Sequence, residues 1–96
     1  MPLKEFQKIS KITIIPTFSE SEYAKFARML EKNEAEKLLP YSEFLDSVEI
    51  KRQRAIDENS SPRIISVDVE HFKEWCIANN HSITIGALTP YSTRGS

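Results

Sequence analysis

The chain contains one local pattern twice: an apolar run with β-branched residues, then a capping residue, then apolar residues at helical spacing. Residues 12–18 lead into Ser19, and residues 64–67 lead into Asp68. Period-two alternation is typical of a half-buried strand, and the spacing that follows is typical of an amphipathic helix. Ser and Asp are favoured helix N-caps because their side chains accept a bond from a free main-chain N–H. The two junctions therefore predict strands covered by helices.

Spacing and end signals predict three helices, two of them at these junctions. At the first junction, Ser19 and Glu22 have the spacing of a capping box, which predicts a helix from about residue 20. A second helix is predicted over 41–57, and a short third one begins after Asp68 and ends at Asn79 and Asn80, which suit a left-handed cap. The inward stripe predicted for the second helix consists of Tyr41, Phe44, Leu45, Val48, Arg52, Ala55 and Ile56.

A third strand is predicted over 83–87, where Ile83, Ile85 and Ala87 alternate with small polar residues. Residues 63–87 then form a short β-α-β unit with parallel strands, and an antiparallel return of the last strand stays open. Pro16 is expected at a sheet edge or at the end of pairing, because it has no N–H to donate. With a short opening helix over 2–9, the order is (α)-β-α-α-β-α-β, a three-stranded sheet covered by helices in two layers, of the α+β or small α/β class. We expect one domain over 1–90 and a flexible tail over 91–96.

Composition excludes several classes of protein. The 96 residues carry a net charge of −1, and no block of like charge is long enough for a nucleic-acid arm or an acidic tail. A single cysteine, Cys76, excludes an internal disulfide framework and suits a reducing compartment. There is no apolar stretch of membrane-spanning length and no secretory leader, so we expect a soluble cytoplasmic protein with no membrane partner.

No catalytic, metal or cofactor site is predicted. His71 and Cys76 are five positions apart on one predicted helix and point about 140° apart, so they cannot form a nucleophile and base. The two histidines lack the spacing of metal ligands. No glycine-rich phosphate loop is present, because Gly86 and Gly95 are the only glycines. Cys76 shares the apolar stripe of its helix and is interpreted as a small buried hydrophobe. An enzyme is therefore not favoured.

Two residues of the second helix lie on a face that does not suit their side chains. Arg52 falls within the apolar stripe, so its charge must snorkel, pair with a carboxylate or reach another subunit. Ile50 points the opposite way, among charged side chains, and could be the apolar centre of a contact. We therefore expect a non-catalytic protein-interaction module that self-associates as a homodimer, with Ile50, Arg52 and Arg54 as the partner-binding residues.

Two alternatives stay open. The basic cluster Lys51–Arg54 could serve a nucleic-acid-associated regulator, although these residues point around the helix and Glu49, Asp57 and Glu58 flank them. A small-ligand binder is the other alternative. Its cleft would form between Tyr41, His71 and Trp75, because aromatic rings and a titratable histidine suit a pocket.

Overall fold

A computed structural model describes residues 11–94, so the helix predicted over 2–9 lies outside the described residues. This part of the chain is a compact α+β structure. The elements, in order, are β1 (Lys11–Thr17), α1 (Glu20–Met29), α2 (Lys32–Ala35), α3 (Tyr41–Asp57), β2 (Ser60–Ser66), α4 (Val69–Ala78), the 3₁₀ turn η2 (Ile85–Ala87) and α5 (Leu88–Ser92).

The two strands of the described chain form a parallel pair. Lys11 lies opposite Ser60 and Thr17 lies opposite Ser66, with no bulge between. Helices α1, α2 and α3 make the connection between them, as parallel strands require a long crossover. The prediction of a β-α-β unit over 63–87 is therefore wrong: the parallel partner of β2 is β1, which precedes it.

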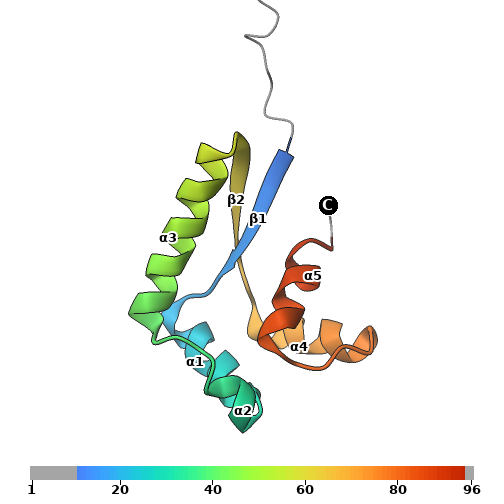
Figure 1. Ribbon diagram of the computed structural model, residues 1–96. Helices are drawn as coiled ribbons and strands as arrows, with labels where there is room; N and C mark the ends of the chain where they lie inside the picture. Colours follow the sequence, from blue (N-terminus) through green and yellow to red (C-terminus); the bar gives the residue numbers. More distant parts are fainter. Residues whose placement is uncertain (1–10, 95–96) are drawn as a thin grey trace, which may run out of the picture.

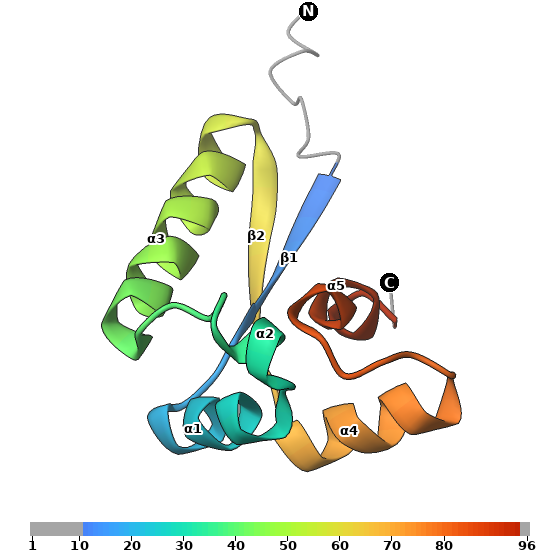
Figure 2. The same cartoon turned by 60° about the horizontal axis from the view of Figure 1, so that its bottom comes forward.

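The helices surround the strand pair unevenly. Helix α3 packs against both strands, and α5 lies beside β1 on the opposite side, as Figure 1 shows. Helices α1, α2 and α4 gather beyond the carboxyl ends of the strands (Figure 2). Most of the apolar core lies at this end, where Phe26 and Phe72 are fully buried and their rings meet edge to face at 5.8 Å. Under α3, the sheet contributes the buried Ile15.

The predicted starts of α1 and α4 and the left-handed cap after α4 are confirmed. Ser19 caps α1, and its Oγ accepts a bond from the Glu22 N–H at 3.2 Å. Asp68 caps α4 by accepting from the His71 N–H at 3.1 Å, and Asn80 takes a left-handed φ of 58° beyond the helix. Pro16 stays within the ladder, opposite Ile65, on a strand with an open edge. These signals depend on a few neighbouring residues, which is why the sequence suffices to read them.

The predicted third strand is wrong, because Ile85–Ala87 forms a 3₁₀ turn that leads into α5. Two side chains accept bonds from main-chain N–H groups that a strand would have used for pairing. The Thr84 Oγ1 accepts from the Ala87 N–H at 3.2 Å, and Glu34 accepts from the Ile85 N–H at 3.0 Å. Ile83 and Ile85 still pack against the core from this conformation. The alternation of apolar residues over 83–87 therefore indicated which side chains are buried, but it did not indicate a strand.

The predicted tail also needs correction, because it was placed from residue 91. Tyr91 and Ser92 belong to α5 and are only 3% and 5% exposed. The Tyr91 ring packs edge to face against Phe72 and Trp75, with centroids 5.2 and 5.5 Å away. Within the described range, no helix is long and apolar enough to cross a membrane.

Candidate functional site

The reactive side chains that the sequence singled out have structural partners. Cys76 is fully buried, and this burial raises the pKa of its thiol. The His71 Nδ1 lies 2.7 Å from the Tyr91 hydroxyl, which joins α4 to α5. Across residues 11–94, no group of His, Cys, Asp and Glu side chains is arranged to hold a metal ion. These residues thus serve the packing of α4.

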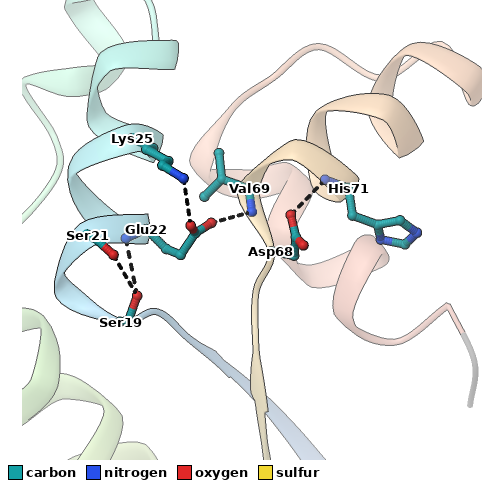
Figure 3. A network of polar contacts seen from close by, with 7 residues as sticks. All are labelled: Ser19, Ser21, Glu22, Lys25, Asp68, Val69 and His71. Carbon is teal, nitrogen blue, oxygen red and sulfur yellow. Dashed lines mark hydrogen bonds and ion pairs between the residues drawn. The ribbon is translucent and has the colours of Figure 1, made fainter.

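The carboxyl ends of the strands carry a polar network that joins the two junctions (Figure 3). The Glu22 carboxylate does not bond back to the Ser19 N–H as a capping box would have it. It accepts instead from the N–H of Val69 at 2.8 Å, at the start of α4, and from Lys25 at 3.1 Å. The Val69 N–H, followed by the Lys25 ammonium, holds the pKa of Glu22 below its ordinary value. Two amides at the start of α4, those of Val69 and His71, are therefore satisfied by the chain's own carboxylates.

Glu34 makes a second tie of the same kind between distant segments. Its carboxylate accepts from the N–H of Ile85 at 3.0 Å and from the Lys37 ammonium at 3.2 Å. These two donors, the main-chain one first, lower the pKa of Glu34. The bond anchors the segment before α5 to α2.

The three residues of the predicted ligand cleft lie in different settings. The Tyr41 hydroxyl donates to the Phe18 carbonyl at 2.9 Å, at the start of α3. His71 bonds Tyr91, whereas Trp75 stacks on His81 with ring centroids 4.8 Å apart. The structure does contain a cleft, but none of these three residues lines it.

This cleft has a volume of about 580 Å³ and lies along the edge of β1 that faces away from β2. Its walls come from β1, α1, α3, the segment before α3, and the segment from η2 into α5. No residue of β2 lines it, which places it at the open edge of the sheet. We call it the β1 cleft. Residues that line it include Thr13, Ile14, Pro16, Phe18, Phe44, Ser47, Lys51, Arg54, Glu58, Gly86, Leu88 and Thr89.

The β1 cleft changes from apolar to charged along its length. Helix α3 runs opposite to β1 (Figure 1), so the start of α3 lies beside the end of β1. At that end the ring of Phe44 packs against Phe18 at 5.7 Å. Towards the other end, α3 contributes Lys51 and Arg54, and Glu58 directly follows the helix; all three are exposed. Within the described chain, neither Lys51 nor Arg54 forms an ion pair.

The open edge of β1 also carries main-chain groups that β2 does not bind. The Val67 N–H donates to the Thr17 carbonyl at 2.9 Å, which fixes the phase of the ladder. In a parallel pair, alternate residues turn both main-chain groups towards the partner strand. Thr17 and Ile15 therefore face β2, and Ile14 and Pro16 turn theirs to the open edge. Ile14 offers an N–H and a carbonyl there, while Pro16 offers only a carbonyl.

Of the three predicted partner-binding residues, only Arg54 lines the β1 cleft. Ile50 is 57% exposed and lies one helical turn before Arg54, on the same flank of α3. Arg52 is on the other flank, where its Nε donates to Glu49 at 3.0 Å; its charge is thus paired within its own helix. This bond lowers the pKa of Glu49.

Sequence reasoning missed most of the cleft, although one signal was present. Phe44, Ser47, Lys51, Arg54 and Glu58 follow one another at steps of three or four residues, which places them on one face of a helix. The other wall depends on η2 and α5, where the sequence predicted a strand over 83–87 and a tail from residue 91. Comparison of the chain with protein-family models, with curated proteins and with solved structures finds no match.

Proposed function

We propose that the chain is a non-catalytic module that binds other proteins, and that a segment of the partner occupies the β1 cleft. The observation that carries this proposal is an apolar cleft of about 580 Å³ beside an open strand edge. Recognition of peptides commonly uses such an edge together with neighbouring pockets for side chains. The buried cysteine and the bonded His71 give no support to a catalytic role.

The experiment selects heptapeptides from a random displayed library on the purified protein and measures synthetic copies by fluorescence anisotropy. Ser47→Trp and Thr89→Trp place a large ring in the cleft from opposite walls. Gln53→Trp adds the same ring to an exposed position of α3 outside the cleft and is the matched control. Circular dichroism checks that each variant is folded.

We expect both cleft variants to weaken binding by at least about tenfold, equivalent to about 1.4 kcal/mol, and the control to stay within about threefold. Selection that yields no binding peptide would contradict the proposal. So would peptides that bind the cleft variants as well as they bind the wild type.

A small amphipathic anion is the second candidate occupant. The cleft volume lies within the range of about 300–1,000 Å³ that is typical of small-molecule sites. Its apolar end and its exposed Lys51 and Arg54 suit a molecule with an apolar body and an acidic head. Titration with anilinonaphthalene sulfonate, with Ser47→Trp as the blocked form, tests this candidate.

A further inference from the structure

We infer that the partner segment binds in an extended conformation, adds to the open edge of β1 as a third strand, and carries acidic side chains. This inference rests on the proposed function and specifies the bound conformation and the chemistry of the partner. It follows from two independent features: the main-chain groups at the open edge of β1 and the charges at the rim of the β1 cleft.

The main-chain groups favour a strand over a helix or a loop. Ile14 turns an N–H and a carbonyl to the open edge, and Pro16 adds a carbonyl two residues on. Successive groups of this kind are about 6.6 Å apart along a strand, which is the repeat of a second extended chain. A helical partner satisfies its own main chain and would leave these groups without a bond. An extended segment can donate to both carbonyls and accept from the Ile14 N–H.

The charges favour an acidic partner. Lys51 and Arg54 are exposed at the rim and form no ion pair with any described residue, whereas Lys37 is held by Glu34. Glu58 is the acidic side chain of the rim. The free charge of the rim is thus net positive, and opposite charges across an interface speed association and select partners.

The same charges disfavour a second copy of this chain as the occupant. A twofold pairing of β1 edges would present one self-complementary surface to itself. Such a pairing runs the two β1 strands antiparallel, so Lys51 and Arg54 at the charged end of one cleft would lie beside the apolar end of the other copy's cleft. They would meet no acidic residue of its lining there. Formation of a homodimer, which the sequence suggested, is therefore an alternative that the experiments below must distinguish from binding of an acidic segment.

The first experiment scans the main chain of the best-binding selected heptapeptide. Each amide nitrogen is methylated in turn, which removes one donor and leaves the side chains unchanged. If the peptide is a strand, the amides that face β1 and those that face away alternate. We expect methylation at every second position of the bound stretch to lower the binding affinity by at least about fivefold, which is the effect of losing about one hydrogen bond. Methylation at the positions between them should change the affinity by less than about twofold.

The second experiment restores a donor to the protein. Pro16→Ala gives β1 a further N–H at its open edge, and its expected effect is peptide binding that is roughly threefold to tenfold tighter, as one added hydrogen bond provides. A misfolded variant cannot give this gain. The matched control is Pro62→Ala, because Pro62 lies on β2, which does not line the cleft.

The third experiment tests charge. The selected peptides are expected to be enriched in Asp and Glu, and Lys51→Glu with Arg54→Glu is expected to weaken their binding by at least about tenfold. Raising the salt concentration should weaken the wild-type complex as well.

The outcomes separate this inference from the proposed function. Peptides that are sensitive to Ser47→Trp but lack the alternating pattern, gain nothing from Pro16→Ala or carry no acidic residues would overturn the inference and leave the binding module. A dimer at micromolar concentration that Ser47→Trp dissociates would show that a second copy occupies the cleft, which also overturns the inference. Absence of any selected peptide removes the proposed function itself.

Discussion

Replacing Tyr91 by Ala tests whether the end of the described chain belongs to the folded unit. The side chain is 3% exposed, and its ring centroid lies within 5.7 Å of the ring centroids of Phe72, Trp75 and His71. Truncation of a fully buried aromatic side chain costs about 3–5 kcal/mol, through lost burial and the cavity that remains. A chain of 96 residues is expected to have an unfolding free energy of roughly 5–14 kcal/mol. Tyr91→Ala should therefore remove a large part of it.

Two milder variants separate the contribution of the hydroxyl to the unfolding free energy from that of the ring. Tyr91→Phe keeps the ring and removes the hydroxyl that lies 2.7 Å from His71 Nδ1, so we expect a loss of about 1 kcal/mol. Tyr91→Leu keeps an apolar side chain and should fall between the other two. Urea unfolding followed by far-ultraviolet circular dichroism gives the free energies. For a domain of this size, 3 kcal/mol corresponds to a fall in Tm of at least about 12 °C.

A loss below about 0.5 kcal/mol for Tyr91→Ala, the usual range of a surface substitution, would refute the reasoning. Residues 91–96 would then be the flexible tail that the sequence suggested. The β1 cleft would lose support with it, because Leu88 and Thr89 of α5 form part of its wall.

Three further predictions concern the start of α4 and its buried thiol. Asp68→Ala should lower the unfolding free energy by about 1 kcal/mol in urea unfolding, because the His71 N–H loses its cap. Glu22→Gln should destabilise the protein at pH 7, since the folded state lowers the pKa of this carboxyl from an ordinary 4.5 by the bond from Val69. A lowered pKa gives stability that is present above pH 4.5 and lost as the pH falls through the folded value. Unfolding curves of wild type and variant should therefore converge in acid, and a constant difference down to pH 2, below the ordinary pKa values of about 4, would contradict this. Cys76 should react with a chromogenic disulfide reagent only as fast as the protein unfolds, because it is fully buried; rapid reaction of the native protein would show that α4 opens locally.

The sequence predicted the ends of helices better than the partners of strands. The bounds of α3 and the caps Ser19, Asp68 and Asn80 each depend on a few adjacent residues. Strand pairing depends on distant ones. Ser60 shows the difference: it precedes the unit predicted over 63–87, but it lies in β2. There it is buried, and its Oγ lies 2.6 Å from the Thr13 Oγ1 of β1.

The β1 cleft could be predicted only in part for the same reason. The face of α3 that lines it is visible in the spacing of Ser47, Lys51 and Arg54. The concavity requires α5 on the other side of β1, and α5 is held there by Tyr91 and by the bond between Glu34 and Ile85. Neither contact follows from local pattern, because Tyr91 is 19 positions from Phe72 and Glu34 is 51 positions from Ile85.

The position of the prolines explains why an open edge is tolerated in so small a sheet. An unpaired strand edge invites association with any extended chain, and proline is one of the residues that limit this. By the phase of the ladder, Pro16 on β1 and Pro62 on β2 both lie at positions that turn outward. Each edge therefore lacks a donor where an added strand would need one. On β1 this leaves the Ile14 N–H as the donor within the cleft, so the main chain alone supports only a short ladder. Affinity must then come from side chains that fill the apolar end and meet Lys51 and Arg54, and this requirement makes the edge selective.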